Sequence, residues 1–366
     1  MITIFDPLQI NSLTLPNRIA RSATAERIAM RSETDGESLA GLYTALAKGG
    51  VGLIISGHIY VHPSGRIYPT MAGICREENF TAWRRTIDLT RRAGGTLFLQ
   101  LNHGGGRCSK EVESAAVCVS SLPDFPKDPM LGTELTEDKI LELIKAFAAA
   151  ARKARELGAD GAQIHAAHGY LVSQFLSPLT NRRNDKWGGA LEDRARFIRL
   201  VIQNARASVG NDFSLGIKLG ACDDSPEGLQ IEEALTVAGW LAEDGLDYIE
   251  VSGGFRADLC RRHAGPGKNE GYYLPFAARF KARLKIPVFA VGGMRSLAKM
   301  NEAIASNQCD AVSMSRPLIR QPDLPLILRA GGASECCGCN LCLLKQGQPT
   351  ACHAQKNQSP GLTNPC

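Results

Sequence analysis

Short, continuously apolar runs alternate with amphipathic stretches along the chain. Each run has about five or six residues, and its apolar positions are consecutive, which is typical of parallel strands that are buried on both faces. The runs cover residues 19–24, 51–56, 96–101, 160–165, 214–219, 247–251, 287–291 and 310–315. This pattern predicts eight buried parallel strands.

The stretches between the runs carry apolar residues at the spacing of a helix. In the clearest of them, Thr136 is a candidate N-cap, because its hydroxyl can accept a hydrogen bond from the first turn. One buried stripe follows at Ile140, Ile144, Phe147 and Ala151. Residues 231–243 and 296–306 behave in the same way, so helices are predicted to separate the strands.

Eight strand–helix units favour a closed (β/α)8 TIM barrel, an α/β fold. The alternative is an open doubly wound sheet, which usually carries a glycine-rich dinucleotide fingerprint after its first strand. Neither G-x-G-x-x-G nor G-x-x-x-x-G-K-[ST] occurs in the sequence. We therefore predict a barrel over residues 1–330 and a cysteine-rich tail over residues 331–366.

Composition and charge restrict the function classes. The 366 residues are 44% hydrophobic and 22% charged, with a net charge of +5, which is ordinary for a soluble protein. No basic run marks a nucleic-acid groove, and no apolar run reaches the ~18 residues of a membrane helix. The N-terminus lacks the pattern of a secretory signal. We expect a cytoplasmic enzyme that binds neither nucleic acid nor a membrane.

The chemistry of a barrel lies at the C-terminal ends of its strands. Small residues, an amide, histidines and two cations gather at these ends: Ala23, Thr24, Ala25, Gly57, Gln100, His165, His168, Lys218, Gly292, Gly293, Ser315 and Arg316. Adjacent glycines leave backbone N–H groups open to an anion, and Arg316 can complete the site. These positions predict a phosphate site, and a tight turn at the glycines is the alternative interpretation.

His165 and His168 lie three positions apart, just after a predicted strand. Two imidazoles this close can donate hydrogen bonds to one carbonyl oxygen. A zinc site is the other use of this spacing, but no third ligand accompanies the pair. Tyr170 follows, and its weakly acidic hydroxyl is suited to delivering a proton.

The tail carries a cluster of cysteines. Two residues separate Cys336 from Cys339 and Cys339 from Cys342, and nine residues separate Cys342 from Cys352. This spacing suits thiolates converging on one metal or cluster. Cys337 is an extra candidate. Disulfides are the weaker interpretation because nothing indicates export, and a tail with free thiols is the remaining one.

Motifs spread over nearly the whole chain up to Arg316 carry a family resemblance. They are FDPL at residues 5–8, LPNRI at 15–19, GGVGLI at 49–54, QLNHGGGR at 100–107 and HAAHGYLVSQFLSPLTNRRNDKWGG at 165–189. With them the sequence resembles the old yellow enzyme family of FMN-dependent ene-reductases. Within that family it is most similar to the branch of 2,4-dienoyl-CoA reductase and trimethylamine dehydrogenase.

The resemblance implies a role for each residue at the strand ends. Ala23, Thr24 and Ala25 would contact the flavin ring, with Gly57 close by. Gln100 would bind its pyrimidine edge, and Lys218 would lie near its N1/O2 side. The FMN phosphate would be held by Gly293, with Gly292 beside it, and by Ser315 and Arg316.

The resemblance also implies the reaction. NAD(P)H or a partner protein would reduce FMN, and a small α,β-unsaturated carbonyl compound of the enone, enoate or enoyl-CoA type would then take hydride from flavin N5. His165 and His168 would bind the carbonyl oxygen, and Tyr170 would protonate the α-carbon. We expect the enzyme to be a homo-oligomer.

The sequence departs from the family pattern at several positions. Lys218 stands where many members have arginine, so the paired N–H donors of a guanidinium are lost. Ala25 stands where many members have threonine or cysteine. Larger relatives hold a [4Fe–4S] cluster in a similar cysteine set and carry further nucleotide-binding domains, which the sequence lacks. The tail would hold either such a cluster, fed by an electron-transfer partner protein, or a zinc ion.

Three rival interpretations differ in the residues that they require. A flavin-dependent tRNA-dihydrouridine synthase would need a cysteine acid and a basic groove, and neither is found. A lyase would use Lys218 as a Schiff base, which requires a deprotonated amine. A non-enzymatic module would use the cysteine tail to bind a partner.

Overall fold

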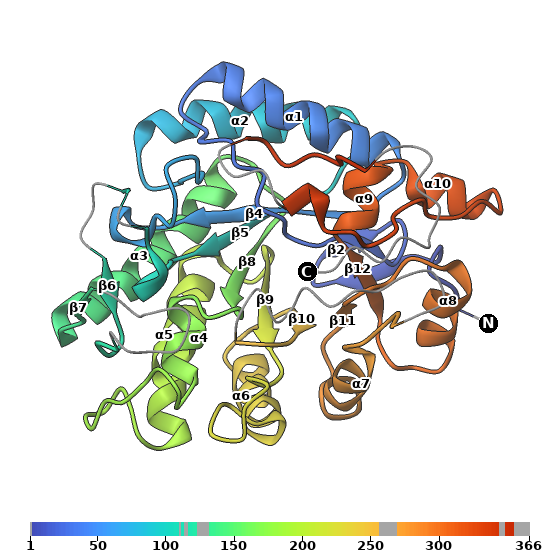
Figure 1. Cartoon of the computed structure of the whole chain (residues 1–366). Coiled ribbons are helices and arrows are strands. Elements are labelled where there is room, and N and C mark those ends of the chain that lie inside the picture. Colours follow the sequence, from blue (N-terminus) through green and yellow to red (C-terminus); the bar gives the residue numbers. More distant parts are fainter. Residues whose placement is uncertain are drawn as a thin grey trace.

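The computed structural model describes residues 2–109, 111–112, 116–122, 132–255, 269–343 and 348–354. Eight parallel strands close into a barrel in the order β3-β4-β5-β8-β9-β10-β11-β12, and β12 pairs with β3 (Figure 1). The strands are β3 (Ile19–Arg21), β4 (Leu53–Tyr60), β5 (Leu97–Asn102), β8 (Gly161–Ala166), β9 (Ser214–Gly220), β10 (Tyr248–Ser252), β11 (Val288–Val291) and β12 (Ala311–Met314). Each falls on one of the eight predicted runs, so the predicted TIM barrel is confirmed.

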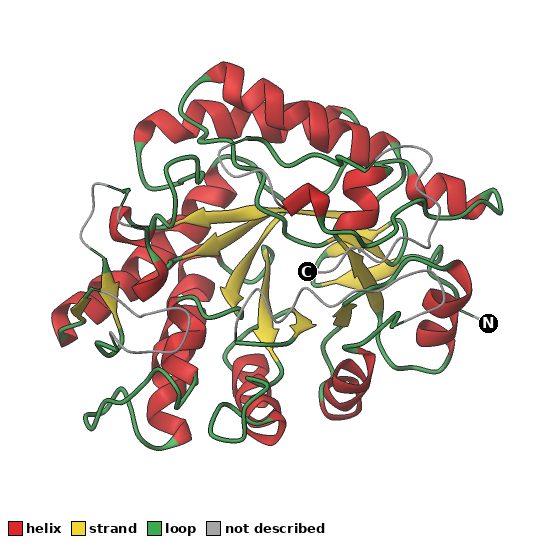
Figure 2. Cartoon of the chain, viewed as in Figure 1, coloured by secondary structure: helices red, strands yellow, loops and turns green. Residues whose placement is uncertain are grey.

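Helices surround the barrel (Figure 2). The longer ones are α1 (Glu33–Lys48), α2 (Glu77–Arg92), α3 (Glu137–Glu156), α5 (Leu191–Val209), α6 (Ile231–Glu243), α7 (Leu274–Arg283) and α8 (Leu297–Ala305). Thr136 caps α3 as predicted, because its side chain accepts a hydrogen bond from Lys139 N. The shorter ones are η1 (Pro63–Gly65), η2 (Gly105–Arg107), α4 (Leu171–Leu176), α9 (Arg316–Arg320), α10 (Leu324–Arg329) and η3 (Leu341–Leu343).

A hairpin that the apolar pattern does not predict fills the N-terminal end of the barrel. It consists of β1 (Leu8–Ile10) and β2 (Leu13–Leu15), which pair antiparallel. Its apolar side chains form one buried cluster with residues near the strand starts, among them Phe98, Tyr248 and Phe289. The hairpin therefore closes one end of the barrel, and a pocket can open only at the other. A second small sheet, β6 (Val117–Cys118) with β7 (Thr133–Glu134), lies outside the barrel.

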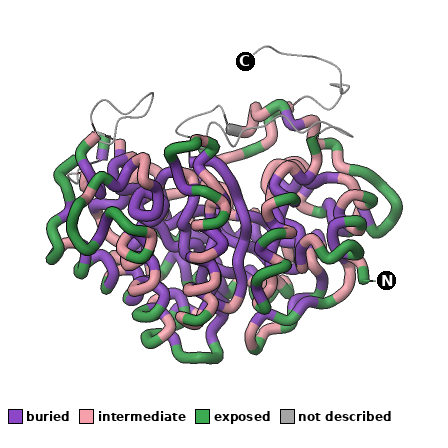
Figure 3. The backbone as a smooth tube through the Cα atoms, turned by 90° about the horizontal axis from the view of Figure 1, so that it is seen from below, coloured by how far each residue is buried: buried purple, intermediate pink, exposed green. Residues whose placement is uncertain are grey.

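The tail begins after α10 and contacts loops at the C-terminal ends of the strands. Thr350 donates a hydrogen bond from its hydroxyl to Ala25 O (2.6 Å), and its N–H donates to Glu26 O. Burial is concentrated in the strands and on the inner faces of the helices (Figure 3). Within the described ranges, no helix has the length and apolar character needed to cross a membrane.

Candidate active site

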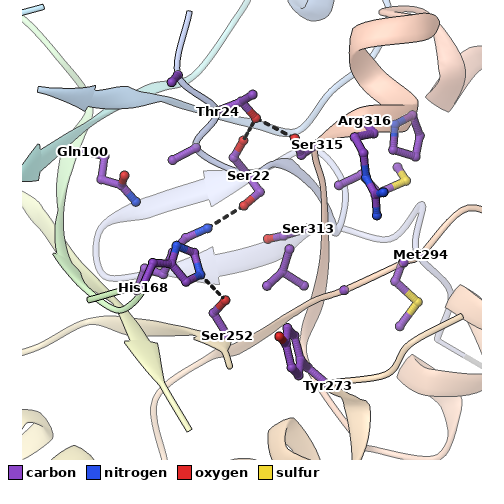
Figure 4. Close-up of a pocket in the computed structure, with 18 of the residues that line it drawn as sticks. Ser22, Thr24, Gln100, His168, Ser252, Tyr273, Met294, Ser313, Ser315 and Arg316 are labelled. Carbon is purple, nitrogen blue, oxygen red and sulfur yellow. Dashed lines mark hydrogen bonds between the residues drawn. The ribbon is translucent and has the colours of Figure 1, made fainter. Parts of the chain in front are cut away.

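A pocket of about 290 Å³ lies at the C-terminal ends of the barrel strands (Figure 4). It brings together every residue predicted for the barrel site except Gly57: Ala23, Thr24, Ala25, Gln100, His165, His168, Tyr170, Lys218, Gly292, Gly293, Ser315 and Arg316. These residues come from strands and loops spread over almost 300 positions of the sequence. The closed barrel brings them to one rim because the C-terminal ends of parallel strands lie together.

Gly57 lies beneath this rim instead of lining the pocket. Its N–H donates to Glu26 Oε1 (2.8 Å), and a Cβ at this position would lie 1.9 Å from Glu26 Oε2. Glu26 also accepts from the Tyr43 hydroxyl (2.7 Å) and pairs with Arg21. Gly57 therefore permits a buried carboxylate that supports the segment carrying Ala25.

One end of the pocket is aromatic and contains the predicted substrate-binding residues. The His165 ring lies edge-on to the His168 ring, with centroids 5.2 Å apart, and edge-on to the Tyr170 ring at 5.0 Å. His58 lies 5.2 Å from the Tyr170 ring and was not predicted as a site residue. The four rings form what we call the histidine end of the pocket.

Burial keeps these imidazoles neutral. It lowers the pKa of His58 to about 4 and that of His168 to about 3, with the Lys218 ammonium adding to both effects. The pKa of His165 is held well below its usual value, mainly by burial and then by His168. Neutral histidines can donate or accept hydrogen bonds without adding charge to the pocket.

Backbone and side-chain partners orient the rings. His165 Nδ1 accepts from Ala167 N (3.3 Å), which leaves the proton on Nε2. His168 has a left-handed backbone (φ +60°), and its Nε2 is 2.8 Å from Ser252 Oγ, as Figure 4 shows. His58 is held at both nitrogens, by Asn102 at 3.0 Å and by the Tyr68 hydroxyl at 3.1 Å.

The pocket wall contains a buried polar relay. Lys218 Nζ donates to Ser22 Oγ (2.7 Å) and lies 3.3 Å from Glu250 Oε2. Gln163 Nε2 donates to the same carboxylate oxygen (3.0 Å), and Gln163 Oε1 accepts from Gln100 Nε2 (2.7 Å). Polar contacts therefore connect Lys218 to Gln100 through Glu250 and Gln163.

Glycines and arginines form the opposite end of the pocket, which we call the arginine end. Gly292 (φ +125°) and Gly293 (φ +74°) follow β11 with left-handed backbones, and a Cβ at Gly292 would lie 2.9 Å from the Tyr272 and Tyr273 rings. Only glycine fits such a position without strain. The backbone thus forms an open concave surface beside Arg316.

Side chains at the arginine end connect the pocket to the tail. Arg316 donates to Asn340 Oδ1 (2.5 Å), and buried Arg295 donates to Cys336 O (2.8 Å). Ser315 Oγ lies 2.7 Å from Thr24 Oγ1. Ser313 Oγ lines the pocket and, within the part of the chain that the structure describes, is buried without a hydrogen-bond partner. Such a group is expected to bind a ligand.

The prediction of a metal site in the tail is not supported. Cys336, Cys337, Cys339, Cys342 and Cys352 line a small pocket of about 20 Å³ next to Arg316 and Arg320. Among the described residues, however, no three histidine, cysteine, aspartate or glutamate side chains are placed to hold one metal ion. Cys352 Sγ instead accepts from Arg320 at 3.8 Å, and Cys339 is exposed. Cys366 and residues 344–347 lie outside the described residues.

Several lining residues are not among the predicted site residues: Ser22, His58, Ser252, Tyr272, Tyr273, Met294, Arg295, Ser313 and Asn340. His58 could have been found, because it follows Gly57 in a predicted strand-end segment. Arg295 likewise follows the predicted glycine pair. Asn340 lies in the tail, where no periodic pattern indicates that the chain returns to the barrel.

Comparisons with known proteins agree with this site. Residues 3–335 match the model of the NADH:flavin oxidoreductase / NADH oxidase family. The chain is 33% identical over 343 residues to the NADH-dependent flavin oxidoreductase iccE of Talaromyces variabilis, covering 86% of this chain and 83% of that protein. It is 31% identical to an NADPH dehydrogenase of Bacillus subtilis (strain 168), covering 87% of this chain and 92% of that protein.

Solved structures of similar proteins share the fold. Morphinone reductase in complex with tetrahydroNAD has a TM-score of 0.76 at 26% identity and covers 92% of each chain. A 2-naphthoyl-CoA reductase in complex with 2-naphthoyl-CoA has a TM-score of 0.86 at 25% identity, and the match covers 96% of this chain but 56% of that one. The chain also spans about half, 53%, of the NADH oxidase of Thermoanaerobacter brockii. The chain belongs to the NADH:flavin oxidoreductase / NADH oxidase family, the FMN-dependent old yellow enzyme family.

Proposed function

We propose that this protein binds FMN in the pocket and uses NAD(P)H to reduce the C=C bond of a small α,β-unsaturated carbonyl compound. The observation that carries the proposal is the arrangement of the pocket's two ends. Neutral His165 and His168 lie beside Tyr170 at one end, and the left-handed glycine backbone lies with Arg316 at the other. A long phosphorylated ring compound and a carbonyl substrate fit such a division.

The lining residues fit FMN. The open backbone at Gly292 and Gly293, with Arg316, would hold the phosphate. Ser313 Oγ, which lacks a partner among the described residues, is a further polar group that a ligand can satisfy. Ala23 and Ala25 are small enough for a flat ring to pack against them, and Thr24 lies between them.

The histidine end would bind and orient the substrate. His165 carries its proton on Nε2 and can donate to a carbonyl oxygen, and His168 offers a second imidazole from the adjacent turn. Polarising the carbonyl makes the β-carbon electron-poor. FMN held in the pocket would supply the two-electron chemistry, a hydride for that carbon. Tyr170 would give its hydroxyl proton to the α-carbon.

The names of similar proteins support a reductase. Two of the similar structures are reductases, of 2-naphthoyl-CoA and of morphinone. Lys218 is engaged by Ser22 and Glu250 and is 3% exposed, so it is not placed to form a Schiff base with a carbonyl substrate. The oxidoreductase proposal is therefore favoured over the lyase.

The test begins with the visible spectrum of the purified protein and identification of the pigment released by acid. We expect FMN. The enzyme is then reduced anaerobically with NADH or NADPH and mixed with 2-cyclohexen-1-one, and cyclohexanone is measured.

Cyclohexene, which lacks the carbonyl, serves as the control and should leave the enzyme reduced, since the histidines have nothing to polarise. A protein that cannot retain FMN after reconstitution would refute the proposal, as would equal reaction of the two alkenes.

A further inference from the structure

We infer that Glu250 is a positioning residue that fixes which atom of Gln100 faces the pocket. This inference deepens the proposed function and rests on it. Glu250 is fully buried inside the barrel and does not line the pocket, so it can act on a ligand only through other side chains. It reaches the pocket by two routes, Lys218 on one side and Gln163 on the other.

Strand register places the members of the relay next to one another. Glu250 on β10 pairs with Lys218 on β9, and Gln163 on β8 pairs with Gln100 on β5. The side chains are 0–3% exposed, so water does not compete for their hydrogen bonds. A buried polar chain of this kind is stable only when its donors and acceptors alternate correctly.

The chemistry of Glu250 fixes the direction of the relay. A carboxylate only accepts hydrogen bonds, and an ammonium only donates them. Gln163 must therefore turn its Nε2 toward Glu250, at 3.0 Å, which leaves Oε1 for Gln100. Gln100 must then turn its own Nε2 toward Gln163, at 2.7 Å. The reverse orientation of either amide would place two donors or two acceptors face to face.

The consequence for the pocket is that Gln100 presents its carbonyl oxygen. Within the described ranges Gln100 Oε1 makes no hydrogen bond with the protein, although Gln100 lines the pocket. Ser22 Oγ accepts from Lys218, so the Ser22 hydroxyl proton is available on the same wall. The wall thus selects a ring edge that carries an N–H donor beside a carbonyl acceptor, which is the chemistry of an imide.

The test compares two ligands that differ at this N–H. Apoprotein is titrated with FMN and with N3-methyl-FMN, and the ratio of the two dissociation constants is measured by flavin fluorescence. We expect the wild-type protein to bind N3-methyl-FMN about tenfold more weakly, the loss that corresponds to one hydrogen bond. The readout is binding and does not depend on turnover.

Two substitutions uncouple Gln100 from Glu250. Glu250→Met removes the acceptor, and Gln163→Met breaks the relay while it leaves the ion pair of Glu250 with Lys218 in place. In both variants the Gln100 amide is free to turn. The dissociation constant of N3-methyl-FMN should then exceed that of FMN by no more than about threefold. Glu250→Gln keeps an oxygen that can accept from Lys218 and Gln163, and we expect it to restore the wild-type ratio.

Ser56→Ala is the matched control. Ser56 Oγ accepts from Gln100 N (2.9 Å), so this variant removes one buried hydrogen bond to the same residue without touching the relay. It should leave the ratio unchanged even if both affinities fall. If Gln163→Met and Glu250→Met weaken the two flavins in parallel, the inference is wrong. If the wild-type protein binds neither flavin, the proposed function itself fails.

Discussion

The histidine end and the arginine end of the pocket are built in different ways. The histidine end consists of rings carried by β4, by the end of β8 and by the turn after β8, and its three histidine rings are held by hydrogen bonds from barrel strands and the turn after β8. The arginine end consists of backbone at Gly292 and Gly293 and of arginines whose partners, Asn340 and Cys336, belong to the tail. Among the described residues, the histidine rings are held within the barrel, whereas both arginines also bind a distant segment.

This difference separates two functions of the pocket. A proton donor and a pair of hydrogen-bond donors must be held firmly if they are to act on one bond of a substrate. An anion site needs charge and open N–H groups, and side chains held by a distant segment can supply part of these. We therefore expect substitutions at the histidine end to change rates and substitutions at the arginine end to change cofactor retention.

The largest effect is expected from Tyr170→Phe. Removing the hydroxyl should slow the reaction of the reduced enzyme with 2-cyclohexen-1-one by about 10²- to 10⁴-fold, the usual contribution of a positioned acid. Reduction by NAD(P)H should proceed at the wild-type rate, because that step needs no proton from Tyr170. Stopped-flow absorbance measures the two steps separately, and equal slowing of both would remove Tyr170 from this role.

The arginine end is tested by Arg316→Met. Loss of a charged hydrogen-bond donor should weaken FMN binding by roughly 10- to 100-fold. Arg320→Met is the control, because Arg320 contacts Glu335 and Ala354 in the tail but does not line the pocket. Fluorescence titration of apoprotein measures both variants. Equal losses would mean that Arg316 acts only by holding the tail.

Acid should destabilise the histidine end. The pKa of His168 is about 3 and that of His58 about 4 in the folded protein, against a usual value near 6.5. Below pH 6.5 the unfolded chain therefore binds more protons, so stability is fully present above that pH and falls as the pH decreases. At pH 5 each histidine should cost about 2 kcal/mol relative to pH 7.

Urea unfolding at the two pH values measures this loss, and His168→Gln should reduce it by about 2 kcal/mol. A pH dependence identical to that of the wild type would contradict the neutral state of His168.

The smallest effect is expected from Thr350→Val, which removes the hydrogen bond from the tail to Ala25 O. The loss of one such bond should lower the free energy of unfolding by about 1 kcal/mol. Thr236→Val is the control, because in the described part of the chain the Thr236 hydroxyl makes a single hydrogen bond, within α6 to Glu232 O. Thermal unfolding of the two variants gives the comparison, and equal stability would mean that the tail is not fastened at Thr350.

The strands were predictable because burial on both faces leaves continuous apolar runs, and all eight runs became barrel strands. The hairpin at residues 8–15 was not predictable, because its strands have three residues each, too few to show a pattern. The partners of Lys218 were also missed. Glu250 lies beside Lys218 because the two residues are paired between β10 and β9. That pairing cannot be read from the sequence, because every strand is apolar and no alternating pattern fixes the register.

In the tail, a clear sequence pattern predicted a site that the structure does not support. Its cysteine spacing predicted a metal site, yet the described residues connect it to the barrel through Asn340, Thr350 and the carbonyl of Cys336. The spacing of cysteines along the sequence indicates which thiolates could bind one metal ion. Whether they do so depends on backbone turns, which leave no periodic pattern in the sequence. The division of the chain at residue 330 stays a prediction.

The β1–β2 hairpin covers the N-terminal end of the barrel, so ligands can approach the pocket only from the C-terminal end. If FMN binds in the pocket as proposed, a nicotinamide and an alkene that use the same face of its ring must bind one after the other. Steady-state rates should then give parallel double-reciprocal lines when the two reactants are varied against each other.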